Sequence, residues 1–228
     1  MNGNQDGSER SVGVYSWLST PWVYDVCQRL IRSDASLAAF FREHIRPTAG
    51  MRILDVGCGT GDALRHLKQV TYIGIDRNEA YIKVAKSRWD RPEIFLCGDV
   101  STISDLNLSQ FDVVFCLGVL HHLDDTTVTG LLHEIASILA PHGRFVSHDP
   151  VYFEGQSRAA QWIISQDRGR FVRTRDALES LAKESFRSVM STIDMRPLRI
   201  PYTEIILECD QWGADRSRGG SAGVALDG

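Results

Sequence analysis

The sequence lacks a long apolar run and lacks an excess of positive charge. Its longest uninterrupted apolar stretch, residues 113–120, has eight residues, whereas a membrane-spanning helix needs about 20. Its 25 basic residues are outnumbered by 29 acidic residues, which gives a net charge of −4. A protein that binds a polyanion usually carries the opposite bias. We therefore expect neither a membrane span nor a nucleic acid partner.

Cysteine is scarce and its spacing is uninformative for metal or disulfide chemistry. The five cysteines are an odd number without a CxxC pair, and the seven histidines are dispersed, so we predict no metal site. Free thiols in a reducing compartment fit this pattern better than disulfides. The polar first ten residues lack the basic start and apolar stretch of a signal peptide. Together these absences predict a cytoplasmic protein.

The order of apolar segments predicts an α/β fold. Continuous apolar strands alternate with amphipathic helices, which is typical of βαβ units and a mainly parallel sheet covered on both faces. Two further strands near the C-terminus have no helix between them, which predicts a hairpin-like, antiparallel end of the sheet. The expected strands are residues 51–57, 71–76, 93–99, 111–118, 143–151, 188–195 and 202–209.

The length of 228 residues corresponds to one domain with additions, at about 150 residues per domain. We predict a helical cap or lid at residues 1–50 and a main domain at residues 51–209. A helical insertion at residues 152–186 interrupts this domain. The last segment, residues 210–228, is rich in Gly, Ser, Ala and Asp and predicts a flexible tail.

The most informative stretch is residues 54–62, LDVGCGTGD. Small residues between a strand and a helix allow the backbone to approach a ligand closely. The GxGxG spacing differs from the GxGxxG of nicotinamide-binding enzymes. Asp76 ends the next strand, where a carboxylate can accept hydrogen bonds from both hydroxyls of a ribose. Asp99 ends the third strand, at the same edge of the sheet, where it would lie beside an adenine ring.

Taken in order, the segments LDVGCGTG, GID, CGDV and FDVVFCLGVLHHLDD resemble a class I S-adenosylmethionine-dependent methyltransferase. The resemblance covers roughly residues 50–150, and the final strand pair fits the family's antiparallel end. It implies a Rossmann-like, mainly parallel seven-stranded sheet with helices on both faces and an antiparallel last strand. It also implies S-adenosyl-L-methionine as cofactor and methyl transfer to an O, N or C nucleophile of a small-molecule acceptor.

Two other functions stay open beside this one. The first is a methyltransferase that acts on RNA or protein, for which a local run of arginines in the insertion is the only support. The second is a non-catalytic cofactor-binding protein, since sites rather than folds decide activity. The sequence pattern indicates no oligomeric state.

By position, the resemblance also implies which residues hold the cofactor. The glycines would form the turn under its methionine part, with Asp55 near the amino group. Asp76 would hold the ribose, Asp99 would meet the adenine amino group, and an aromatic N-terminal segment would form a lid. The full set is Tyr15, Trp17, Asp55, Gly57, Gly59, Gly61, Asp62, Asp76, Arg77, Asn78, Asp99, Val100, Leu117 and Gly118.

Candidate catalytic residues follow the fourth and fifth strands. His121 or His122 could take a proton from a hydroxyl or amine, because the reference pKa of histidine is about 6.5. Either histidine could instead pack on the cofactor or tie the loop to the next helix. Asp149 ends the fifth strand with His148, where the two could orient substrate or satisfy loop amides.

The insertion supplies candidate residues for the acceptor. Its arginines could clamp a carboxylate or phosphate of the substrate, or could lie on a solvated loop paired with neighbouring acids. Trp162 adds apolar surface that could equally belong to the core. The candidates for acceptor binding are His148, Trp162, Arg168, Arg170 and Arg173.

Overall fold

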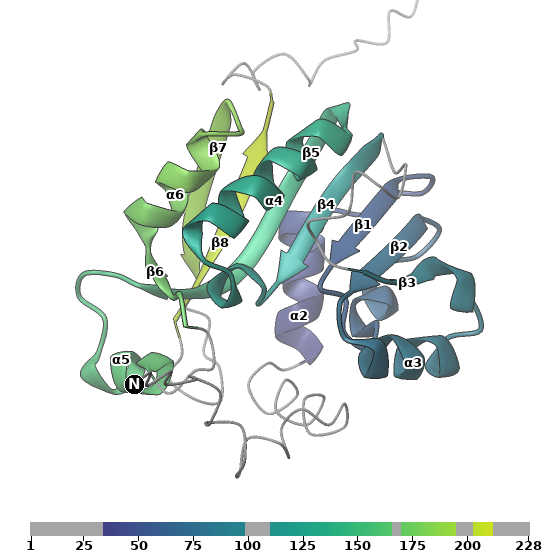
Figure 1. Ribbon diagram of the computed structural model, residues 1–228, viewed down its shortest axis with the longest axis horizontal. Coiled ribbons are helices and arrows are strands. Elements are labelled where there is room, and N and C mark those ends of the chain that lie inside the picture. Colours follow the sequence, from purple (N-terminus) through teal and green to yellow (C-terminus); the bar gives the residue numbers. More distant parts are fainter. Residues whose placement is uncertain (1–33, 99–109, 166–169, 195–202, 212–228) are drawn as a thin grey trace, which may run out of the picture.

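Seven strands form a continuous sheet in the order β3-β2-β1-β4-β5-β8-β7 in the computed structural model, which describes residues 34–98, 110–165, 170–194 and 203–211 (Figure 1). An eighth, two-residue strand, β6, pairs only with β5. The strands are β1 Arg52–Val56, β2 Thr71–Asp76, β3 Phe95–Cys97, β4 Phe111–Leu117, β5 Leu139–Tyr152, β6 Arg173–Thr174, β7 Ser188–Asp194 and β8 Glu204–Asp210.

The sheet is parallel from β3 to β5, and β8 runs antiparallel to both of its neighbours. This confirms the mainly parallel, Rossmann-like sheet with an antiparallel last strand. The short strand β6 was not expected, because two residues are too few to leave a periodic pattern. The carboxyl ends of β1, β2, β4 and β5 share one edge, since parallel strands point the same way.

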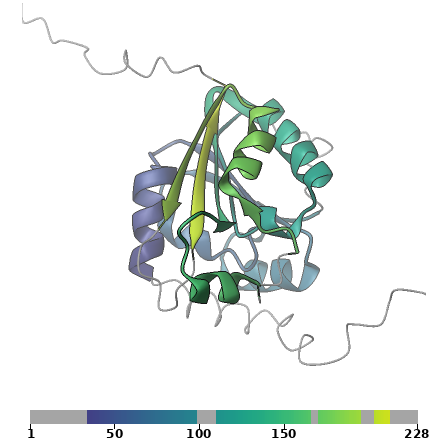
Figure 2. The ribbon, with the colours of Figure 1, turned by 90° about the vertical axis from the view of Figure 1, so that its left-hand side faces the viewer.

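Helices cover both faces of the sheet (Figures 1 and 2). Helices α4 and α6 pack on one face, and α2 and α3 share the hydrophobic core of the other face. Figure 2 shows α2 separated from α4 and α6 by the strands, with α5 near one end. The helices are α2 Asp34–Phe40, continued by a π-helical turn over Phe41–Ile45, α3 Glu79–Arg88, α4 Asp125–Ile138, α5 Arg158–Ser165 and α6 Arg175–Lys183.

Strand β4 shows why the central strands of the sheet have continuous apolar sequences. Successive side chains of a strand point to opposite faces. Val114 and Cys116 therefore join the core under α4, whereas Val113 and Phe115 join the core under α2. All four are fully buried. A strand between two helical layers has no solvent face, so no position calls for a polar residue.

The ends of the chain lie partly outside the described residues. In the predicted tail at residues 210–228, Asp210 still belongs to β8 and Gln211 donates to the carbonyl of Ser185 at 2.9 Å, so the ordered sheet extends one residue further than predicted. The rest of this tail and residues 1–33 of the predicted cap at residues 1–50 fall outside the described residues. The domain boundaries therefore stay predictions. Among the helices that the structure describes, none combines the length and the apolar character needed to cross a bilayer.

Candidate active site

The glycine-rich turn follows β1 and lies directly against two neighbouring segments. Gly57 and Gly61 have φ angles of +75° and +78°, in the left-handed region that favours glycine. A Cβ atom at Gly57 would lie 2.5 Å from Val119 Cγ2, and one at Gly61 would lie 2.8 Å from the ring of Phe95. The turn therefore accepts no side chain at these two positions, for both conformational and steric reasons.

Asp76, at the end of β2, is fixed against this turn. Its Oδ2 accepts a hydrogen bond of 2.9 Å from Gly59 N, and its Oδ1 accepts one of 2.8 Å from Asn78 N. Asn78 in turn caps α3, because its side-chain oxygen accepts from the backbone N–H groups of Ala80 and Tyr81. A carboxylate oxygen can accept more than one hydrogen bond. Asp76 is thus oriented by the backbone while it keeps capacity to bind hydroxyl donors.

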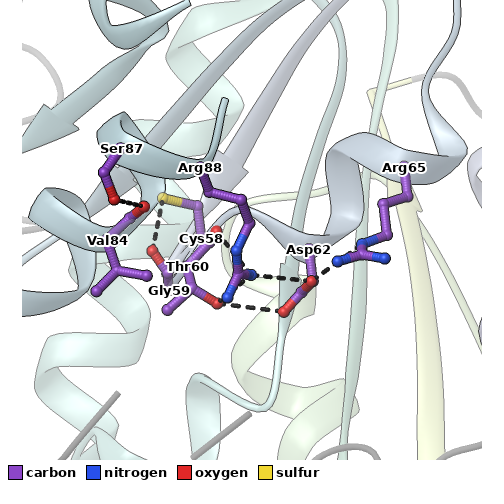
Figure 3. A network of polar contacts seen from close by, with 8 residues as sticks. All are labelled: Cys58, Gly59, Thr60, Asp62, Arg65, Val84, Ser87 and Arg88. Carbon is purple, nitrogen blue, oxygen red and sulfur yellow. Dashed lines mark hydrogen bonds and ion pairs between the residues drawn. The ribbon is translucent and has the colours of Figure 1, made fainter. Parts of the chain in front are cut away.

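A polar network fastens the turn to α3 (Figure 3). The Arg88 guanidinium donates to Thr60 Oγ1 at 3.1 Å and forms an ion pair of 3.1 Å with Asp62. Thr60 Oγ1 also donates to Asp62 at 3.2 Å, and Arg65 contacts the same carboxylate at 3.2 Å. Asp62, a predicted cofactor residue, therefore lies at the start of the helical turn and positions it. A direct contact of Asp62 with cofactor stays a prediction.

Asp55 lies inside the sheet next to a tyrosine. The hydroxyl of Tyr72 donates to Asp55 Oδ2 at 2.8 Å, and both side chains are buried. Burial is the main cause that raises the pKa of Asp55 to about 7, while the hydrogen bond from Tyr72 opposes the rise and the charge of Asp76 adds to it. Because a buried carboxylate gains from a nearby cation, this position favours a positively charged group.

Tyr72 was not singled out from the sequence, although a signal was present. It is the aromatic residue of the predicted strand TYIGID, and a buried tyrosine usually finds a hydrogen-bond partner for its hydroxyl. The side chain packs against Phe95, with ring centroids 5.9 Å apart. Tyr72 thus connects the buried acid with the strand at the edge of the sheet.

His121 and Asp149, both predicted as catalytic residues, are brought together at the ends of β4 and β5. His121 Nδ1 lies 3.0 Å from Asp149 Oδ1, and the His121 backbone N–H points at the same oxygen at 3.4 Å. The side chains are 7% and 2% exposed. A carboxylate beside Nδ1 favours the tautomer that carries its proton there, so that Nε2 becomes the basic nitrogen.

The residues around this pair distinguish the two adjacent histidines. His122 is exposed, and its ring centroid lies 4.0 Å from that of His121. Gly118, a predicted cofactor residue, has a φ angle of +69°, and a Cβ there would lie 3.5 Å from His121 Cε1. The His121 ring therefore stands directly beside the segment that follows β4.

His148 points to the opposite face of β5 from Asp149, since the two are consecutive residues of a strand. Its Nε2 lies 3.4 Å from Asp194 and 3.3 Å from Glu204, and all three side chains are buried. Its ring stacks on Phe40 with centroids 4.9 Å apart. The two residues predicted together at the end of this strand thus share an edge of the sheet but face different layers.

The predicted acceptor residues of the insertion differ in their surroundings. The Arg173 side chain is 8% exposed and donates to the backbone oxygens of Leu120 and Leu123 at 2.9 and 2.7 Å. Trp162, on α5, is 66% exposed, and Arg170 is exposed too. Arg173 therefore contacts the loop that carries His121, while Trp162 and Arg170 present surface that a ligand can reach.

The remaining predicted residues lie at the edges of the site or outside the described residues. Leu117 and Gly118 end β4 half-buried, and Arg77 is exposed beside Asp76. Tyr15, Trp17, Asp99, Val100 and Arg168 lie outside the described residues. Within the described ranges, no group of three or more His, Cys, Asp or Glu side chains is arranged to hold a metal ion.

Comparison with known proteins connects this geometry to a family. Residues 53–143 match the family described as "Methyltransferase domain". A ubiquinone biosynthesis O-methyltransferase from Bradyrhizobium diazoefficiens is 30% identical over 118 residues, which are 50% of this chain and 46% of that protein. The sterol 24-C-methyltransferase erg6 from Schizosaccharomyces pombe is 27% identical over 175 residues, which are 70% of this chain and 44% of that protein.

Solved structures extend the similarity to the fold of most of the chain. The crystal structure of a SAM-dependent methyltransferase from Archaeoglobus fulgidus superposes with a TM-score of 0.63 at 18% identity. The match covers 82% of this chain and 98% of that one. In contrast, the chain spans less than half the length of the two curated relatives above. The sequence matches thus cover 50% and 70% of this chain, whereas the structural match covers 82% of it.

Proposed function

Because residues 53–143 of the chain match the family described as "Methyltransferase domain", we propose that the protein is an S-adenosylmethionine-dependent methyltransferase of a small-molecule acceptor. The relatives named above are an O-methyltransferase and a C-methyltransferase, so similarity alone leaves the acceptor atom open. The geometry of the site favours an acceptor that carries a hydroxyl or an amine, for the reason given below.

The residues of the glycine turn and of β2 fit the cofactor. The turn brings backbone to the edge of the sheet without a side chain in the way, as a close ligand requires. Asp76 is oriented to accept from a ribose diol. Asp55 suits the cationic amino group, because a cation stabilises its ionised form. When bound, S-adenosylmethionine supplies a methyl group activated by its sulfonium charge.

The buried His121–Asp149 pair is the observation that carries the acceptor chemistry. An O–H or N–H nucleophile must lose a proton during methyl transfer, and a positioned histidine can accept it. Asp149 holds the proton of His121 on Nδ1 and stabilises the imidazolium that forms when Nε2 is protonated. We propose His121 as the general base and Asp149 as the residue that orients it.

Two measurements test this function. Calorimetric titration with S-adenosylmethionine and S-adenosylhomocysteine should show binding, and Asp76→Asn should weaken it by about tenfold or more, because the ribose loses a charged acceptor. A panel of small phenols, catechols and amines should then reveal methyl transfer. Absence of binding of either cofactor form would disprove the proposal. Binding without turnover of any acceptor or of cell extract would favour the non-catalytic alternative.

A further inference from the structure

The loop that carries His121 is held by the insertion as well as by Asp149. The backbone N–H of Phe171 donates to the carbonyl of His121 at 3.1 Å. The Arg173 guanidinium donates to the carbonyls of Leu120 and Leu123 on either side, at 2.9 and 2.7 Å. Two residues of the insertion therefore bind three backbone carbonyls of the His121 turn, which is the 3₁₀-helical turn Leu120–His122 with the following Leu123.

The insertion is itself fixed to the strand that supplies Asp149. Arg173 and Thr174 form β6, which pairs with Val151 and Tyr152 of β5. Asp149 precedes this pairing by two residues. The contacts therefore close a ring that runs from His121 through Asp149 and β5 to β6, and back through Arg173 to the His121 turn. Figure 1 shows β6 between α5 and α6, close to the end of β5.

Arginine is the side chain that this position requires. Its guanidinium presents five N–H donors in a rigid fork, and here they bind the two carbonyls above, the carbonyl of Phe171 at 3.1 Å and the carboxylate of Asp125 at 2.7 Å. A lysine places one charged group on a flexible stem and cannot reach these acceptors together. Hydrogen bonds that involve a charged donor are also stronger than neutral ones.

We propose that Arg173 is a positioning residue for the transfer reaction: it holds the His121 turn so that the imidazole stays aligned with Asp149. This inference rests on the proposed role of His121 as base. Arg173 thus acts on the reaction through His121 rather than as a clamp on the acceptor.

Nuclear magnetic resonance of the histidine side chains tests the alignment without a known acceptor. The full chain is labelled with ¹⁵N-histidine and saturated with S-adenosylhomocysteine, and the His121 signals are assigned by their loss in His121→Asn. The readouts are the His121 tautomer and the exchange rate of its Nδ1 proton with solvent. The matched control is Arg175→Met, because Arg175 belongs to the same insertion but contacts Glu179 and Ser191 instead.

We expect Arg173→Met to accelerate exchange of the His121 Nδ1 proton by about tenfold or more, as loss of a charged hydrogen bond would. Arg175→Met should stay within about twofold of the wild type, since it leaves the turn intact. Arg173→Lys keeps the charge beside Asp125 and should fold, yet it should reproduce most of the acceleration. If Arg173→Met does not fold, Arg173→Lys alone decides.

Unchanged His121 exchange and tautomer in folded Arg173→Lys and Arg173→Met would overturn the inference. The same samples separate this failure from failure of the proposed function. If the wild-type protein does not bind S-adenosylhomocysteine, the proposed function fails. If all variants bind S-adenosylhomocysteine with wild-type affinity and the His121 tautomer and proton exchange do not change, the positioning role alone fails.

Discussion

The two halves of the candidate site are held together in different ways. On the side of β1 and β2, the turn at residues 57–61 and Asp76 are fixed mostly by backbone conformation and by hydrogen bonds between residues 17 and 28 positions apart. Such separations are typical of a single βαβ unit. On the side of β4 and β5, Asp149 contacts His121 from 28 residues along the chain, and Arg173 contacts the carbonyl of Leu120 from 53 residues along it. The first half is a local motif within one βαβ unit, whereas the second is assembled with the help of the insertion.

This difference has a consequence for substitution. A local motif fails when its own residues change, because its conformation is encoded where it stands. An assembled site also fails when residues of other segments change, because each of them contributes a contact that holds the site in place. The predictions below exploit this contrast.

The largest effect is expected on the assembled side. His121→Asn should lower kcat by about 10²- to 10⁴-fold with an O–H or N–H acceptor, because the general base is lost. The affinity for S-adenosylhomocysteine should change much less than kcat, since His121 is not among the predicted cofactor residues. Steady-state kinetics and calorimetry measure the two quantities. His122→Asn is the matched control, and an equal loss of kcat in both variants would argue against a specific role of His121.

On the local side, Gly57→Ala should abolish measurable cofactor binding, or weaken it by about a hundredfold. The new methyl group would lie 2.5 Å from Val119 Cγ2 at a φ angle of +75°. The cost combines backbone strain with overpacking, each of about 1–3 kcal/mol. Gly50→Ala is the control, because Gly50 has a φ angle of +85° but open space around its Cβ position. Calorimetry with S-adenosylhomocysteine should show normal binding by that variant.

A pH effect is expected from Asp55, whose pKa is raised from 3.8 to about 7. If the cofactor amino group binds the ionised acid, affinity should increase with pH and level off above about pH 7. Between pH 5.5 and 7.5 the increase should be about 25-fold, because the ionised fraction of a single acid with a pKa of about 7 rises by that factor. Calorimetry over this range should give a flat profile for Asp55→Asn. A profile shared by both proteins would place the titrating group elsewhere.

The same pKa has a consequence for stability. A carboxyl whose pKa is raised on folding favours the folded state at low pH, and this contribution is lost as pH rises toward the folded pKa. Stability of the wild type should therefore fall relative to Asp55→Asn between about pH 4 and pH 7. Urea unfolding at several pH values measures the difference. A constant difference across this window would contradict the raised pKa.

The smallest effect is expected from a helix cap in the insertion. Thr174 accepts a hydrogen bond from Ala177 N at 3.3 Å and caps α6. Thr174→Ala should lower the free energy of unfolding by about 1 kcal/mol. Thr174→Ser keeps the hydroxyl and should retain most of the stability. Cofactor affinity should be unchanged in both variants, because α6 lies away from the glycine turn.

The contrast also explains what the sequence could predict. The order of strands and the cofactor half could be anticipated, because apolar strands, glycines and Asp76 leave a pattern within a single segment. For His121 and Asp149, the sequence predicted that both lie at the same edge of the sheet, but not that their side chains are in contact. Arg173 was grouped with its neighbouring arginines as a substrate clamp, because nothing in a run of basic residues tells which one meets a carbonyl fifty residues away. The strand β6 could not be predicted either, because its two residues are too few to leave a periodic pattern.

The register of β5 has a further consequence. Seven residue pairs fix β5 against β8, and the pairing with β4 continues to Leu117 and His148. A slip of one residue would exchange the faces of His148 and Asp149. His121 would then face an imidazole instead of a carboxylate, and the acid would lie against Phe40. The hydrogen bonds between strands therefore decide which side of the sheet can host the proposed proton transfer, so that backbone pairing is itself a determinant of the chemistry.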